Sequence, residues 1–108
     1  MTESEFLAAA EAALSKIETA LEQVSDSTDL DVECSRNGNV LEIEFVGSKI
    51  IVNSQAPMQE LWIAAKSGGF HYRQHGDTWL NTRDGSEFFA ALSVMISQQG
   101  GVPVVLQS

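Results

Sequence analysis

The dipeptide Asn37-Gly38 constrains the fold of this chain most, because it lies between two runs of alternating apolar and polar residues. Those runs span residues 29–35 and 39–45. An Asn-Gly pair in this setting is the strongest short-range signal for a β-hairpin. With Asn37 and Gly38 as the turn, the expected cross-strand pairs are Cys34–Leu41, Val32–Ile43, Leu30–Phe45, Glu33–Glu42 and Asp31–Glu44.

The first strand of this predicted hairpin carries only carboxylates on its outward face: Asp29, Asp31 and Glu33. Acidic residues are poor strand formers, and like charges that face each other destabilise a sheet. The pattern has two interpretations, a solvated acidic face or a site that recruits cations or a basic partner. Carboxylate oxygens suit hard cations such as calcium, magnesium, manganese or iron, but the spacing does not match an EF-hand loop.

The negative charge of the chain is concentrated in its first part. Of fifteen acidic residues, eleven precede residue 45, accompanied by two of the six basic residues, Lys16 and Arg36. The rest of the chain has four acids and four bases, so the net charge of −9 comes from residues 1–44. Such a surface argues against nucleic acids and anionic membranes as partners. It favours cations and basic protein surfaces.

An amphipathic helix is predicted near the N-terminus. Residues 4–24 carry apolar side chains at three- and four-residue spacing, and Thr2 and Glu5 have the spacing of a capping box. At about 100° per residue, three acids share the border of the apolar stripe: Glu11, Glu18 and Glu22. We therefore expect an acidic surface where this helix meets the next layer.

Short strands and a second helix complete the predicted fold. Strands are expected at residues 49–55, 61–65, 70–75 and 78–81, and a helix is expected to begin after residues 84–87 and to end at the glycines 100–101. The apolar tail after this helix is expected to pack back onto the domain. The order predicts one α+β domain over residues 1–108, a two-layer α–β sandwich. Its N- and C-terminal helices would cover one face of an antiparallel sheet of about five or six strands.

Three residue types outside the acidic face were considered for chemistry. Cys34 is the only cysteine, which excludes an internal disulfide, and its alternation onto the apolar face predicts a buried, unreactive thiol. Two histidines, His71 and His75, share a strand face with Arg73; a surface role is favoured over metal binding. Trp62 is expected on the open face of the sheet, either as a partner-binding anchor or shielded by its neighbours.

The chain lacks the usual signatures of enzymes and of targeting. It has no Ser/His/Asp elbow, no phosphate loop and no Cys-x-x-Cys, so we expect no enzymatic activity. Its first residues do not read as a secretory or transit signal, and no apolar run approaches the length of a membrane span. These patterns predict a cytoplasmic protein.

Several distinctive motifs occur along essentially the whole length of the chain. They include the acidic first helix, DLDVE at residues 29–33, and the pattern N-x-Q-x-P-x-x-x-x-W formed by Asn53, Gln55, Pro57 and Trp62. GGFHY at residues 68–72 and then Trp79, Arg83 and Gly85 follow. Through these motifs the chain resembles the bacterial members of the frataxin family. The resemblance implies two near-parallel helices on an antiparallel sheet, as the patterns predict.

The resemblance also implies a function. It implies a monomer that binds ferrous or ferric iron weakly, and also other divalent cations, and that regulates iron–sulfur cluster assembly as an iron sensor or donor. It implies docking on a cysteine desulfurase and a scaffold protein, partly through the same acidic surface. Carried over by position, the metal-binding residues, called the acidic ridge below, are Glu11, Glu18, Glu22, Asp26, Asp29, Asp31 and Glu33. The partner-binding residues are Asn53, Gln55 and Trp62.

Two other functions remain open at this point. One is an iron-storage or ferroxidase-type oligomer, which would use the same carboxylates. The other is an acidic protein-binding module that has no physiological metal.

Overall fold

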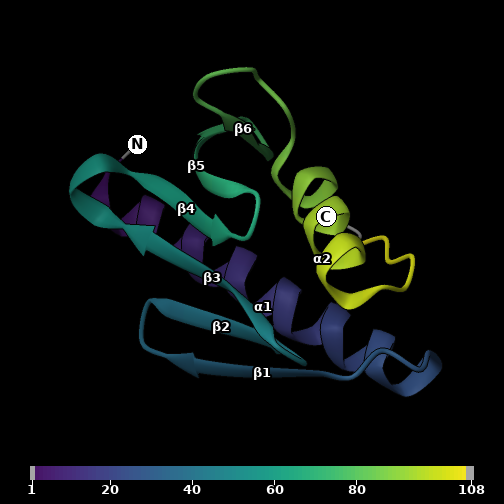
Figure 1. Ribbon diagram of the computed structural model, residues 1–108. Coiled ribbons are helices and arrows are strands. Elements are labelled where there is room, and N and C mark those ends of the chain that lie inside the picture. The colour runs from purple at the N-terminus through teal and green to yellow at the C-terminus, as the bar shows by residue number, and fades with distance from the viewer. Residues whose placement is uncertain (1, 107–108) are drawn as a thin grey trace.

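The computed structural model describes residues 2–106, which form a six-stranded sheet and two α-helices (Figure 1). The helices are α1 (Glu3–Ser27) and α2 (Phe88–Gly100), and a 3-10 helix η1 (Ala56–Met58) follows the third strand. The strands are β1 (Val32–Asn37), β2 (Val40–Phe45), β3 (Ser48–Gln55), β4 (Glu60–Ala65), β5 (Gly68–His75) and β6 (Thr78–Asn81). Their order in the sheet follows the chain, and every neighbouring pair is antiparallel. The predicted fold class is confirmed.

The two helices begin where the sequence signals predict. At the start of α1 the Thr2 hydroxyl accepts the backbone N–H of Glu5, and the Glu5 carboxylate accepts that of Thr2, which forms the expected capping box. The helix continues three residues beyond the predicted end, to Ser27. At the start of α2 the Glu87 carboxylate accepts two backbone N–H groups, and Gly101 ends this helix with a φ of 75°.

Only one face of the sheet is covered. Along each central strand the buried side chains alternate with exposed or half-buried ones, as for Leu41 and Ile43 in β2 and Ile50 and Val52 in β3. The buried set packs with apolar residues of both helices, such as Ile17 and Leu92, in one core. The opposite face of the sheet carries polar and charged side chains such as Glu42 and Asn53, together with Trp62 and Ile51.

The C-terminal tail packs onto the domain as predicted. Val104 and Leu106 are buried, and their backbone N–H groups donate to the hydroxyls of Ser97 and Ser93 on α2 at 2.8 Å. Within residues 2–106, neither helix combines the length and the apolar character that crossing a membrane requires.

The predicted register of the first hairpin is wrong by two residues. The turn consists of Gly38 and Asn39, so Asn37 pairs with Val40, Cys34 with Ile43, and Glu33 with Glu44. Gly38 occupies the first central position with a φ of 63°, the geometry that a two-residue turn with glycine first requires. A shift of two residues preserves which face each side chain occupies, because the side-chain period of a strand is two. It changes only the cross-strand partners.

Candidate functional site

The acidic ridge extends from α1 across the connection to β1. Its helical members are Glu11, Glu18, Glu22 and Asp26, and Glu33 lies on β1. Asp29 and Asp31 were expected within a strand, but β1 begins only at Val32, so both precede the sheet. Leu30 between them is buried, which turns the two carboxylates outward even without strand pairing. All seven side chains reach solvent; Glu18 is half-buried and the others are exposed.

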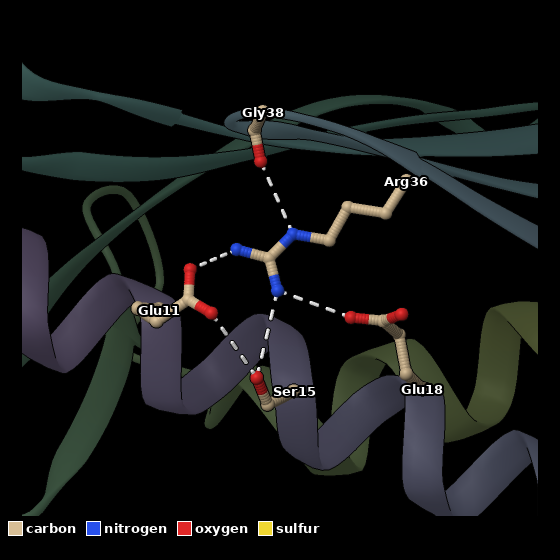
Figure 2. A network of polar contacts seen from close by, with 5 residues as sticks. All are labelled: Glu11, Ser15, Glu18, Arg36 and Gly38. Carbon is tan, nitrogen blue, oxygen red and sulfur yellow. Dashed lines mark hydrogen bonds and ion pairs between the residues drawn. The ribbon is translucent and has the colours of Figure 1, made fainter.

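Arg36 of β1 binds two members of the acidic ridge. Its guanidinium group lies between the carboxylates of Glu11 and Glu18, as Figure 2 shows, with 3.1 Å from Nη1 to Glu18 Oε1. It also donates to the Ser15 hydroxyl and, through Nε, to the Gly38 carbonyl at 3.1 Å. The hydrogen bond to Glu11 and the contacts with Glu18 raise the pKa of Arg36 above its already high ordinary value. The expectation that the helical acids border the next layer is confirmed for Glu11 and Glu18, but no contact of this kind involves Glu22 among the described residues.

The other ridge carboxylates have no such partner. Across residues 2–106, no hydrogen bond or ion pair involves the side chains of Glu22, Asp26, Asp29, Asp31 or Glu33. In the same part of the chain, no three His, Cys, Asp or Glu side chains form a group that could hold one metal ion. The ridge therefore offers hard oxygen donors for exposed, loosely coordinated cations rather than a closed metal cage.

The second strand adds two more acids beside the ridge, with different surroundings. Glu44 lies opposite Glu33, so one like-charged pair does face across β1 and β2. Glu42 lies opposite Ser35, and the ammonium group of Lys49 is 3.2 Å from its carboxylate. The predicted Glu33–Glu42 and Asp31–Glu44 pairs are thus replaced by a single Glu33–Glu44 pair.

Cys34 departs from its predicted burial. It shares the helix-facing side of β1 with Val32 and Arg36, but β1 is the edge strand and the Cys34 side chain is exposed. Partial desolvation, followed by the negative charge of Glu18, raises the pKa of the thiol to about 11. The thiol therefore stays protonated near neutral pH, so its predicted low reactivity has a physical basis despite the exposure.

The three predicted partner-binding residues lie together on the open face of the sheet. Asn53 of β3 pairs with Trp62 of β4, and the Gln55 amide donates to the Asn53 side-chain oxygen at 3.1 Å. The indole ring of Trp62 is half-buried and stacks on the His71 imidazole, with ring centroids 4.2 Å apart and planes 5° apart. Trp62 is therefore partly shielded by a neighbour and also displayed on the surface.

A buried carboxylate that the sequence analysis missed lies beneath this pair. The Glu60 side chain is only 5% exposed, although it belongs to the open face. It accepts the indole N–H of Trp62 at 2.8 Å and Nε–H of Arg73 at 2.9 Å, and His71 Nδ1 is 3.5 Å away. The alternation Glu60–Trp62 already places both side chains on one face, which is the signal that could have found this group. Glu60, Trp62, His71 and Arg73 are called the Glu60 cluster below.

Comparisons of the sequence identify close relatives. A family model for the frataxin-like domain matches residues 1–102. The iron–sulfur cluster assembly protein CyaY of Janthinobacterium sp. (strain Marseille) is 72% identical over 109 aligned positions, which cover 99% of this chain and 97% of that protein. The protein of the same name from Herminiimonas arsenicoxydans is 69% identical with the same coverage.

Comparisons of the structure agree. Frataxin from Psychromonas ingrahamii, of the CyaY family, matches with a TM-score of 0.89 and 33% identity over the whole of both chains. Trimeric yeast frataxin, solved in complex with ferrous iron, matches with a TM-score of 0.76 over 86% of each chain; at 19% identity this shows a shared fold. The length of these matches and the identity with the bacterial proteins confirm the resemblance. The chain belongs to the frataxin family, in its CyaY branch.

Proposed function

We propose that this chain is a non-enzymatic, iron-binding regulator of iron–sulfur cluster assembly that docks on the cysteine desulfurase and its scaffold protein. Clustered ridge carboxylates would hold iron weakly and exchange it readily. The same charge would steer the chain onto a basic patch of the desulfurase. The relatives named above as iron–sulfur cluster assembly proteins support the process, and the acidic ridge supports the means.

The observation that carries this proposal is the set of five exposed ridge carboxylates without an ion pair among the described residues, Glu22, Asp26, Asp29, Asp31 and Glu33. A surface selected only for solubility would mix charges of both signs. Here the residues between 20 and 35 include no basic side chain at all. Such a stretch attracts cations and basic protein surfaces without offering a fixed coordination geometry.

The open face of the sheet would supply a second contact. Trp62 combines a flat, oriented aromatic surface with the adjacent amides of Asn53 and Gln55. Ordered aromatic side chains surrounded by polar groups are frequent energetic anchors of protein interfaces. We propose that this face, in addition to the acidic ridge, contacts the desulfurase–scaffold complex.

Iron binding is tested by titrating the protein with ferrous iron without oxygen and following its backbone amides by NMR. Shifts or broadening should concentrate at residues 22–33, where the unpaired carboxylates lie. If the amides of this segment do not respond to iron, the iron-binding part of the proposal is wrong.

Docking is tested with a matched pair of charge-reversal variants. Asp29→Lys/Asp31→Lys should weaken binding to the desulfurase, measured by titration calorimetry, because it reverses charge within the ridge. Glu3→Lys/Asp77→Lys changes the net charge equally at exposed positions outside the ridge and should bind nearly as the unaltered protein does. Equal affinities for the two variants would contradict docking through the ridge.

A separate titration with ferrous iron in the presence of oxygen distinguishes regulation from storage. An iron-storage oligomer would grow into large particles on addition of iron and oxygen, with oxygen consumption proportional to the iron added. A regulator should remain of constant size by light scattering under these conditions.

A further inference from the structure

The turn of the first hairpin places an unbound asparagine side chain directly before a glycine. Asn37 is the last residue of β1, it is exposed, and among residues 2–106 its side-chain amide forms no hydrogen bond. Gly38 follows it as the first turn residue, and within the same part of the chain its backbone N–H has no acceptor. The amide carbon of an asparagine and the backbone nitrogen of the next residue are the two groups that react when asparagine deamidates.

The other three asparagines of the chain differ from Asn37 in both respects. None of them precedes a glycine, and each has a side chain that forms a hydrogen bond. Their partners are the Ser54 carbonyl for Asn39 at 2.8 Å, the Gln55 amide for Asn53 at 3.1 Å, and the Arg83 backbone N–H for Asn81 at 2.8 Å. A side chain on the following residue hinders the approach of its nitrogen, and glycine has no such side chain. The structure therefore distinguishes Asn37 from three chemically identical side chains.

We propose that Asn37 and Gly38 form a site of spontaneous deamidation in the folded protein, and that the isoaspartyl product loosens the attachment of the first hairpin to α1. This inference goes beyond the proposed function and holds whether or not the chain binds iron. The site needs no enzyme and no cofactor, only water. It converts a neutral residue into an acidic one and therefore changes the charge of the protein.

The reaction has two steps. The Gly38 nitrogen loses its proton to solvent and attacks Cγ of Asn37; the new N–Cγ bond closes a succinimide ring, and the Cγ–Nδ2 bond breaks to release ammonia. Water then adds to one of the two ring carbonyl carbons, whose bond to the nitrogen breaks, and the nitrogen takes back a proton. Opening at the backbone carbonyl carbon gives isoaspartate, and opening at Cγ gives aspartate. One water is consumed, one ammonia is released, and nothing is oxidised or reduced.

The position of Asn37 makes this reaction accessible without unfolding of the domain. The main chain between Asn37 and Gly38 must rotate out of its strand geometry to bring the two groups together. Only the terminal Asn37–Val40 pair has to open, because β1 is an edge strand and the two turn residues already lie outside the ladder. Opening at the end of a strand costs far less than global unfolding. Ring closure then breaks no further hydrogen bond, because neither reacting group has a partner.

The isoaspartyl product changes the backbone where the hairpin is attached to α1. Its main chain runs through Cβ and Cγ, so it is one carbon longer between residues 37 and 38. The Gly38 carbonyl accepts Nε–H of Arg36 at 3.1 Å, and the same guanidinium group binds Glu11 and Glu18 of α1 (Figure 2). A longer turn displaces this carbonyl, so Arg36 loses the contact that orients it from its own hairpin.

The site is tested by incubating the full-length protein at neutral pH and 37 °C, roughly the warm end of the range in which mesophilic domains stay folded. Peptide mass spectrometry then measures the replacement of NH2 by OH at each of the four asparagines. A peptide of residues 32–43 serves as the unfolded reference. We expect reaction at Asn37 alone, slower than in the peptide by about tenfold, because one terminal backbone pair must open first.

Two results would overturn the site. Reaction through global unfolding would be slower than in the peptide by about a thousandfold or more, so any retardation beyond about a hundredfold contradicts deamidation of the folded protein. Equal reaction at Asn37 and Asn39 would contradict the selectivity. Isoaspartate is identified with protein isoaspartyl methyltransferase and a labelled methyl donor. The label should appear on the peptide that contains residue 37 and should be absent from that peptide in Asn37→Gln, whose longer side chain closes a ring much more slowly.

The consequence for the hairpin is tested by comparing the isoaspartyl form with Asn37→Asp. The isoaspartyl form is separated by anion exchange, and the variant carries the same added charge without the longer backbone. In the isoaspartyl form the Nε–H of Arg36 should exchange faster with solvent by NMR, and the unfolding temperature should fall by about 5 °C. Asn37→Asp should lower it by less than about 2 °C and leave the Arg36 signal in place. Identical behaviour of the two forms would overturn the proposed loosening.

Discussion

The acidic ridge and the Glu60 cluster use the same chemical group in opposite ways. In the Glu60 cluster one carboxylate is buried and bound by Trp62 and Arg73, with His71 close by. In the ridge five carboxylates are exposed and have no ion pair within residues 2–106. A carboxylate surrounded by donors stabilises a local structure, whereas an exposed and uncompensated one remains free to bind something else.

The comparison separates two kinds of recognition on one small domain. The Glu60 cluster holds an aromatic ring in a defined orientation, so any partner would meet a shaped surface. The ridge presents charge without shape, which suits weak cation binding and electrostatic steering. Glu11 and Glu18 lie between these extremes, because they are partly exposed and share the single positive charge of Arg36.

The largest expected effect is on stability at the Glu60 cluster. Glu60→Ala should lower the free energy of unfolding by about 2 kcal/mol, because the half-buried indole N–H of Trp62 and the partly exposed Arg73 guanidinium lose their shared acceptor. Urea denaturation measures this loss. The matched ridge variant Asp31→Ala should change stability by less than about 0.5 kcal/mol. Similar losses of stability in both variants would contradict the difference between a buried, hydrogen-bonded carboxylate and an exposed, unpaired one.

An intermediate effect is expected on partner binding. Trp62→Ala should weaken binding to the desulfurase–scaffold complex by about 1–2 kcal/mol, with the salt dependence of binding unchanged, because a shaped aromatic contact is lost. Asp29→Lys/Asp31→Lys should instead reduce the salt dependence of binding to the desulfurase. Calorimetry at two salt concentrations measures both. A change in the salt dependence of binding for Trp62→Ala would contradict the separation of recognition by shape from recognition by charge.

The smallest effect is expected where like charges oppose each other in the sheet. Glu33→Lys should raise the free energy of unfolding by about 0.5 kcal/mol, because it replaces repulsion of Glu44 with attraction. This gain should shrink in high salt. The control is Glu42→Lys, which removes the existing ion pair with Lys49 and should give no gain. Thermal unfolding at low and high salt provides the measurement.

Much of the fold follows from local patterns. The capping box at Thr2, the glycine that ends α2 and the period-two alternation of the strands each act over a few residues, and each is confirmed. The alternation also placed Trp62 and Glu33 on the open face, even though the first hairpin is shifted by two residues. The predicted face of each side chain stays correct despite that error, because a shift of two residues preserves the side-chain alternation.

The failures concern the exact hairpin turn and the contacts between segments that are distant in the sequence. Turn chemistry alone favoured Asn37-Gly38, whereas the folded chain uses Gly38-Asn39 and brings Arg36 onto α1. Cys34 follows the predicted side of the strand but lies at the uncovered edge of the sheet. Burial of Glu60 needs donors from β5 as well as β4, and pairing of these strands is not encoded in either one alone.

The sequence by itself determined the class of the fold, the face that each strand residue occupies and the excess of negative charge before residue 45. These depend on spacing and composition, which are local properties of the chain. Only the tertiary structure decided which acids have a partner: Glu11 and Glu18 share Arg36, Glu42 pairs with Lys49, and Glu60 accepts hydrogen bonds from Trp62 and Arg73. The reason is that electrostatic compensation depends on distances in space, and those distances are set by register and packing.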